Sequence, residues 1–277
     1  MVTRSILRPV LRPVTRAVSD TIRGFNPRSL FASGEQGIWL DPSDFSTLFQ
    51  DAAGTTPVTA VGQPVGLIRD KSGRGNHASQ TTAASRPTLQ QDSNGLYYLS
   101  FDGTDDGMIA GAASTFNFLH NNLGATVFCG YMPSGASVYH TILATGNLGN
   151  PSAVGFTLGQ DDRTVGITYN IIANGSGSLF VNSNPTTGVT ASKRVVSVVN
   201  AAGNHITRKN AVQISAATET GSASLANSAY VLNIGRTGSG AFPLNGRIYQ
   251  LIVRGAESNA GQIAATEAWV NGKTRAY

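Results

Sequence analysis

Residues 244–253 read LNGRIYQLIV, and this stretch decides the fold class. Apolar residues fill most of it, and it is long enough for a central strand of a sheet. A helix pattern follows, in which Asn259 can act as the cap, Gln262 can complete a capping box, and Asn271 with the next glycine can end the helix. From residue 36 onward, short apolar segments alternate with turn residues, which is typical of a sandwich or barrel. We therefore predict an all-β body with one C-terminal helix.

The composition agrees with an all-β chain. Among 277 residues there are 32 glycines, and only 13% of the residues are charged, so Ser, Thr and Asn supply much of the polarity. This excludes a helical bundle, and the 40% share of hydrophobic residues excludes a charge-driven disordered chain. No apolar run is long enough for a membrane span. The single cysteine, Cys129, excludes an internal disulfide, and we expect it to be an inert core residue.

The positive charge is concentrated in the N-terminal segment. Residues 1–28 hold six arginines and one acid, which accounts for the whole formal net charge of +5. Residues 7–14 contain the repeat LRPV twice, and its two prolines exclude one regular helix through both. We predict an extended basic arm over residues 1–35 and one domain over residues 36–277. The arginines of the arm are Arg4, Arg8, Arg12, Arg16, Arg23 and Arg28.

We predict that these arginines anchor the protein to acidic groups on its partners. Two other interpretations of the arm stay open. It resembles a targeting presequence in being rich in arginine and poor in acids, although the prolines weaken the amphipathic helix that such a segment needs. It could also be a solvated tail without a role.

Three stretches of the body resemble one family. Residues 70–77 read DKSGRGNH, residues 101–106 read FDGTDD, and residues 246–253 are followed by the helix. In order and spacing these stretches resemble the laminin-G-like and concanavalin-A-like jelly rolls, over about residues 37–272. The resemblance implies a jelly-roll sandwich with one C-terminal helix, and it implies no particular function.

A second resemblance involves the junction between arm and body. Residues 25–31 read FNPRSLF and residues 37–44 read GIWLDPSD, after the Arg-Pro repeat. This combination is similar to structural proteins of tailed-bacteriophage particles that join a basic arm to a laminin-G-like domain. The resemblance implies a virion protein assembled in the host cytoplasm, and a homo-oligomer with the trimer as the favoured form. It leaves open whether the tail tip, a fibre or the capsid surface carries the protein.

The sequence lacks the patterns of catalysis. Concanavalin-like glycosidases use paired carboxylates, and residues two apart share one face of a strand. No glutamate has an acidic residue two positions away; the glutamates are Glu35, Glu219, Glu257 and Glu267. The four histidines lack metal-ligand or triad spacing. We therefore predict that the protein is not an enzyme.

Two further candidate sites come from polar clusters. Asp102, Asp105 and Asp106 fit either a calcium site or a turn whose carboxylates bond to backbone amides; we favour the turn and predict no cofactor. The predicted tip loops at 133–140, 147–153 and 236–243 combine Gly, Ser and Asn with single aromatics, which suits contact with sugar or protein. The candidate ligand-contact residues are Tyr139, His140, Asn147, Asn150 and Phe242.

These patterns predict a non-enzymatic virion structural protein. Its jelly roll is an exposed module that the arm fixes to capsid, tail or baseplate subunits, and a host-surface glycan is a candidate ligand. A head-decoration or cement protein without ligand binding and a free carbohydrate-binding lectin remain open alternatives. Nucleic acid is not an expected partner, because the arm lacks interleaved aromatics and lysines.

Overall fold

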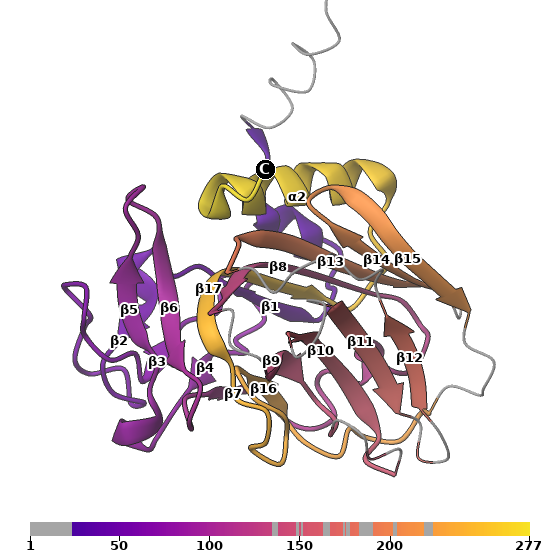
Figure 1. Cartoon of the computed structure of the whole chain (residues 1–277), viewed down its shortest axis with the longest axis horizontal. Coiled ribbons are helices and arrows are strands. Elements are labelled where there is room, and N and C mark those ends of the chain that lie inside the picture. The colour runs from indigo at the N-terminus through magenta and orange to yellow at the C-terminus, as the bar shows by residue number, and fades with distance from the viewer. Residues whose placement is uncertain are drawn as a thin grey trace, which may run out of the picture.

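In the part of the chain that the structure describes, the protein is a sandwich of two antiparallel sheets with a C-terminal helix outside it (Figure 1). This confirms the predicted all-β jelly roll with a C-terminal helix. The computed structural model describes residues 24–277 apart from 135–137, 148–149, 151, 163–166, 174, 176–177, 183–190, 202–203 and 219–223. All arm arginines except Arg28 lie outside the described residues.

Among the residues that the structure describes, the first sheet has eight strands. They are β1 (Gly37–Leu40), β5 (Thr88–Gln91), β6 (Tyr97–Asp102), β8 (Ala125–Pro133), β13 (Arg194–Ala201), β14 (Asn204–Lys209), β15 (Val212–Thr218) and β17 (Asn245–Arg254). The order is β15-β14-β13-β8-β17-β6-β5, and β1 also pairs with β17. One edge of β17 pairs with β8, while the other pairs first with β6 and then with β1. The predicted central strand is therefore central.

The second sheet, over the described ranges, has nine strands in the order β12-β11-β10-β9-β16-β7-β4-β3-β2. In chain order these are β2 (Leu48–Phe49), β3 (Leu67–Ile68), β4 (Ala78–Ser79), β7 (Met108–Ala110), β9 (Tyr139–Ala144), β10 (Gly155–Asp161), β11 (Ile167–Ala173), β12 (Ser178–Asn182) and β16 (Leu232–Ile234). Short 3-10 helices connect some strands: η1 (Pro27–Phe31), η2 (Phe45–Thr47), η3 (Ala83–Ser85) and η4 (Asn117–Leu119).

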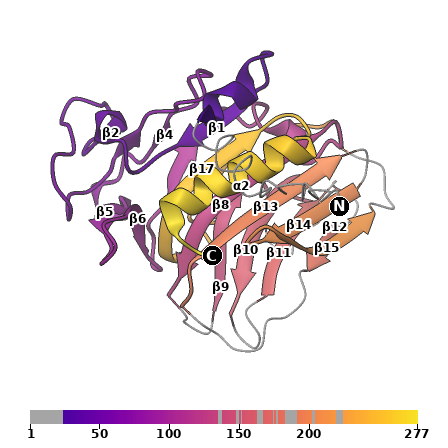
Figure 2. The same cartoon turned by 90° about the horizontal axis from the view of Figure 1, so that it is seen from above.

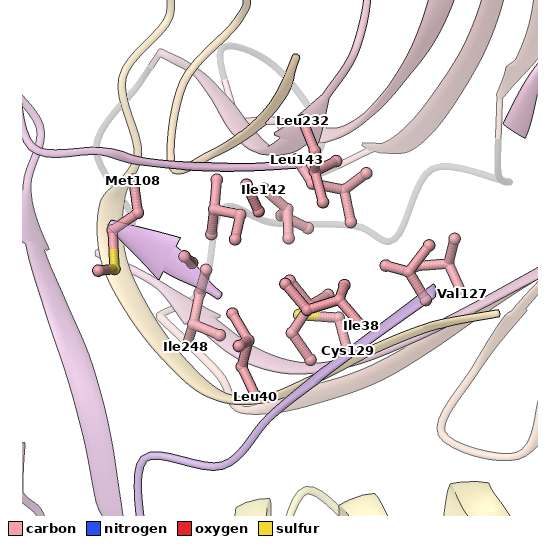
Figure 3. Packing of buried hydrophobic residues seen from close by; sticks show 14 of the residues in the cluster. Ile38, Leu40, Met108, Val127, Cys129, Ile142, Leu143, Leu232 and Ile248 are labelled. Carbon is pink, nitrogen blue, oxygen red and sulfur yellow. The ribbon is translucent and has the colours of Figure 1, made fainter. Parts of the chain in front are cut away.

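The main core lies between the two sheets (Figure 3). Side chains alternate across a strand, so Ile38 and Leu40 of β1 enter this core, whereas Trp39 packs in a second cluster. Cys129 of β8 is also in the core, where burial raises the pKa of its thiol. The sequence prediction of an inert buried cysteine agrees with this position.

Helix α2 (Ala260–Thr274) lies across the first sheet (Figure 2). Its Val270 and Trp269 pack with Trp39 of β1 and with residues of η1 in the second hydrophobic cluster. The predicted capping box is present: Asn259 Oδ1 accepts from the backbone N–H of Gln262 at 2.9 Å, and Gln262 Oε1 accepts from that of Asn259 at 3.0 Å.

The predicted end of this helix at Asn271 was wrong. The helix continues to Thr274, and Arg275 takes the left-handed conformation with φ of 51°. Asn271 stays helical because its side-chain oxygen accepts from the backbone N–H of Ala276 at 2.8 Å, which ties down the chain that leaves the helix. Strand β5 was not predicted, because Leu89 is its only apolar residue. Within the described part of the chain, no helix is long and apolar enough to cross a membrane.

Residues 25–35, which the sequence analysis placed in the arm, pack on the body. Leu30 and Phe31 of η1 are buried in the second hydrophobic cluster. Arg254 Nε at the end of β17 donates to the carbonyl of Leu30 at 2.7 Å, and its Nη2 pairs with Glu35 at 2.8 Å. The described start of the chain is therefore held beside α2.

Candidate functional site

The DKSGRGNH stretch is a loop organised by Asp70. Asp70 Oδ1 accepts from the backbone N–H of Trp39 at 2.9 Å and of Ser72 at 2.8 Å. Its Oδ2 accepts from Ser72 Oγ at 2.7 Å and from the backbone N–H of Asn76 at 3.1 Å. The Asn76 amide in turn donates to the carbonyl of Gly37 at 2.7 Å. The motif therefore fixes the loop against β1 and places Lys71 next to Trp39.

A cavity of about 700 Å³ lies between this loop, β1 and α2. This volume is within the usual range of small-molecule sites, about 300–1,000 Å³. We call it the tryptophan cavity, because Trp39 and Trp269 both line it. Its other lining residues are Asn26, Arg28, Asp41, Ser43, Asp44, Asp70, Lys71, Gly73 and Lys273.

The two tryptophans form the aromatic wall. Their ring centroids are 6.3 Å apart with an interplanar angle of 79°, and the ring centroid of Phe25 lies 6.4 Å from that of Trp269. Trp39 is buried and Trp269 is partly exposed. The indole N–H of each is buried and makes no hydrogen bond with a described residue. Unpaired buried donors are rare in folded proteins.

Two lysines and two aspartates form a polar wall beside the rings. Lys71 Nζ and Lys273 Nζ each lie 3.3 Å from Asp41 Oδ2, and Lys71 Nζ is also 2.6 Å from Asp44. Lys71 lies over the Trp39 ring at 4.7 Å and Lys273 over the Trp269 ring at 5.5 Å. The rings and the charged groups thus hold one another in place.

The Asp44 carboxylate of the tryptophan cavity does not have the raised pKa of a general acid. Burial acts to raise the pKa of Asp44, but the hydrogen bonds from Lys71 and Ser46 lower it below its ordinary value overall. A general acid of a glycosidase needs a raised pKa. Asp41 and Asp70 already accept hydrogen bonds from this chain. The cavity therefore offers fixed donors and acceptors next to aromatic surface.

The predicted tip-loop residues make separate local contacts, and none of them lines the tryptophan cavity. The Tyr139 and Phe242 rings meet edge to face at 5.5 Å, and Ser239 Oγ donates to Asn147 Oδ1 at 2.9 Å. Asn150 is exposed and accepts from the backbone N–H of Ser152. Phe242 lies three residues before the start of β17, whereas Trp39 pairs with Ile252 near its end, so the Tyr139–Phe242 contact and the tryptophan cavity lie toward opposite ends of this strand.

His140, the fifth predicted contact residue, is fully buried. Its Nδ1 accepts from the backbone N–H of Asn245 at 3.2 Å, and its Nε2 lies 3.6 Å from Asp162. Burial raises the pKa of Asp162, while Gln160 and the nearby Arg194 and His140 act to lower it. His140 thus contacts the chain at the start of β17 from inside the protein and has no exposed surface for a ligand. Ligand contact by the other four residues stays a prediction.

The three aspartates of the FDGTDD stretch form a turn. Their carboxylate oxygens lie within 4.8 Å of one another. Asp106 Oδ2 accepts from the backbone N–H of Asp102 at 3.0 Å, and Asp105 Oδ2 accepts from Ser85 Oγ at 2.6 Å. Burial, followed by the charges of Asp102 and Asp105, raises the pKa of Asp106 to about 6. Calcium binding here stays a prediction.

Replacing Asp106 with asparagine is expected to stabilise the protein at neutral pH. The folded-state pKa of about 6 lies above the ordinary 3.8, so the carboxylate penalises folding as the pH rises through this window. Asp106→Asn removes the charge and keeps an acceptor for Asp102. The free energy of unfolding should rise by about 1–2 kcal/mol near pH 8 and change little near pH 4. Urea denaturation at both pH values checks this; an equal gain at both would contradict it.

Comparisons with known proteins agree with the fold. No protein-family model matches the chain, and no curated protein sequence matches it. The binding domain of botulinum neurotoxin serotype D/C is 11% identical with a TM-score of 0.57, over 88% of this chain and 53% of that one. A structure of botulinum neurotoxin type C, which depends on two ganglioside molecules to enter cells, is 11% identical with a TM-score of 0.53, over 73% and 48%.

A third structure, the CBM40 of the Ruminococcus gnavus IT-sialidase, is 14% identical with a TM-score of 0.46, over 55% of this chain and 85% of that one. The present chain spans about half the length of the neurotoxin structures it matches. At these identities the likeness to the two neurotoxin structures shows the shared β-sandwich jelly roll alone.

Proposed function

We propose that the protein is a non-enzymatic saccharide-binding module whose ligand occupies the tryptophan cavity. The observation that carries this proposal is the partly exposed Trp269 ring beside a fixed set of ammonium and carboxylate groups. A sugar ring has an apolar face of C–H groups and a rim of hydroxyls. It needs aromatic surface on one side and several oriented donors and acceptors at its edge.

The tryptophan cavity supplies both kinds of contact. Lys71 and Lys273 can donate to hydroxyls, and Asp41 and Asp44 can accept from them, in charge-assisted hydrogen bonds. The lining holds three acidic and three basic side chains, so its formal charge is balanced. A balanced lining suits a hydroxylated ring better than a nucleic acid, which needs an excess of positive charge. A polar ligand group could also satisfy an indole N–H that the fold leaves unpaired.

The fold comparison supports the same proposal. The neurotoxin serotype D/C structure is a binding domain, and neurotoxin type C interacts with ganglioside molecules. Both share the sandwich with this chain. We place the binding site from the cavity of this chain, not from the comparison.

One pair of variants distinguishes ligand binding in the tryptophan cavity from ligand binding at the tip loops. On an array of immobilised oligosaccharides, Trp269→Ala is expected to weaken binding of the best ligand at least about ten-fold, because one stacked ring contributes on the order of 1–3 kcal/mol. Tyr139→Ala, which removes an aromatic of the tip loops, is the matched control and should bind as the wild type does. Far-ultraviolet circular dichroism confirms that both variants fold. Loss of binding in Tyr139→Ala with retention in Trp269→Ala would contradict the proposal.

We also propose that this module lies in a virion, that the arm anchors it there, and that it is a trimer. The described chain begins beside α2 (Figure 1), and Phe25 packs on Trp269. An anchored arm would therefore leave the body next to the tryptophan cavity. Arg28, the arm arginine that the structure describes, lines that cavity.

A further inference from the structure

A second, smaller cavity of about 420 Å³ adjoins the tryptophan cavity. Arg28 and Arg74 line it together with Ser29 and Ser72, and Arg28 and Gly73 also line the tryptophan cavity. No carboxylate is among its lining residues in the described part of the chain. We call it the arginine cavity. It differs from its neighbour in carrying two positive charges without a balancing acid.

Both guanidinium groups keep unused donors. Arg74 Nη2 donates to the carbonyl of Phe31 at 2.5 Å, while its Nε is buried without a hydrogen bond to a described residue. The guanidinium of Arg28 lies against Gly73: a Cβ at this glycine would lie only 3.4 Å from Arg28 Nη2. Within residues 24–277 as described, the Arg28 side chain has neither an ion pair nor a hydrogen bond.

Asp70, an acid of the neighbouring cavity, does not fill this role. Asp70 lines the tryptophan cavity, and its two oxygens accept four hydrogen bonds from Trp39, Ser72 and Asn76. Two guanidiniums beside one cavity repel each other and favour an anion between them. Their planar, forked donors match the oxygens of sulfate, phosphate and carboxylate groups better than a lysine would.

We propose that the arginine cavity is a subsite for an anionic substituent, a sulfate ester or a carboxylate, on the saccharide whose ring occupies the tryptophan cavity. This inference rests on the proposed function, because it assigns the substituent of the same ligand. The two cavities meet at Arg28 and Gly73, so a substituent can enter one cavity while its ring stays in the other. The ligand class is then an acidic saccharide with an uncharged ring face.

The test compares each neutral oligosaccharide with the same compound carrying one sulfate or one carboxylate. On an array printed with these sets, the wild type should bind the anionic members about ten-fold tighter than the neutral ones. This ratio corresponds to the free energy of about one hydrogen bond to a charged group. Arg28→Gln and Arg74→Gln should reduce this ratio to about two-fold or less. The matched control is Arg69→Gln, which removes an exposed arginine that lies over Phe49 and lines neither cavity. It should keep the wild-type ratio.

The outcomes distinguish the two proposals. Equal affinity of wild type for neutral and anionic members, or a ratio that survives in both Arg28→Gln and Arg74→Gln, overturns the subsite and leaves saccharide binding intact. If no saccharide binds, the proposed function fails, and inorganic sulfate tests the cavity alone. At constant ionic strength, sulfate in place of chloride should then raise the melting temperature of wild type more than that of Arg28→Gln, because exclusion of sulfate from the surface stabilises both proteins whereas binding stabilises only the wild type. An equal effect on both proteins would show an adventitious ion only.

Discussion

Replacing Arg254 with methionine is expected to lower the free energy of unfolding by about 3–5 kcal/mol, because it leaves a largely buried acid without its partner. Arg254 is 7% exposed and Glu35 is 14% exposed, and their side chains meet at 2.8 Å. The same guanidinium donates to the carbonyls of Leu30 at 2.7 Å and Glu257 at 2.8 Å. One side chain thus joins η1, β17 and the start of α2, and both η1 and α2 contribute residues to the tryptophan cavity.

The loss should depend on pH. Burial acts to raise the pKa of Glu35, but the hydrogen bond from Arg254 holds it below its ordinary 4.5. A lowered carboxyl pKa stabilises the fold above the unfolded-state value, and this contribution disappears as the pH falls through the folded-state value. Urea denaturation should therefore show a larger loss near pH 7 than near pH 3.

The matched control for this prediction is Arg69→Met, because Arg69 is exposed and its contact is the Phe49 ring at 4.4 Å. Its expected loss is below about 1 kcal/mol. A loss of that size for Arg254→Met as well would show that the buried pair does not hold η1 and α2 together.

Arg208→Met is expected to cost about 3 kcal/mol, for a related reason. Glu267 of α2 is 2% exposed, and Arg208 Nε of β14 donates to it at 2.7 Å. Ser197 Oγ of β13 donates to the same oxygen at 2.6 Å. Losing the arginine leaves a buried carboxylate with one neutral donor. The hydrogen bond with Glu267 also raises the pKa of Arg208, so the arginine is charged throughout the usual pH range.

A double-mutant cycle checks this assignment. Glu267→Leu alone should cost less than Arg208→Met, because Arg208 is 24% exposed and can turn to water. The double variant should recover part of the loss, since an apolar pair can replace a buried ion pair. Additive losses, with no recovery in the double variant, would mean that the pair does not couple α2 to the sheet.

The parts of the fold that depend on local patterns could be predicted from the sequence. The apolar run of β17 predicted a central strand, and Asn259 with Gln262 predicted the start of α2, because both signals lie within a few residues. Strand β5 was missed because its burial depends on neighbours distant in sequence. The end of α2 was misplaced because Asn271 bonds to the chain end instead of closing the helix.

The candidate site was harder to predict. The DKSGRGNH stretch was recognised as a family feature, but only the structure shows Asp70 fixing the loop against Trp39. Trp39 and Trp269 lie near opposite ends of the chain, and no spacing rule connects them. A signal was present, since they are the only two tryptophans. The tip loops were chosen for composition, and composition cannot distinguish a buried histidine such as His140 from an exposed one.

The central claim is that a saccharide binds against Trp269, and the two tryptophans make it directly measurable. In the variant Trp39→Phe, Trp269 is the single source of tryptophan fluorescence. Titration with the strongest array ligand should change its emission in a saturable way, with the same dissociation constant as direct binding gives. A ligand that binds Trp39→Phe with that constant while the emission of Trp269 stays unchanged would contradict the account.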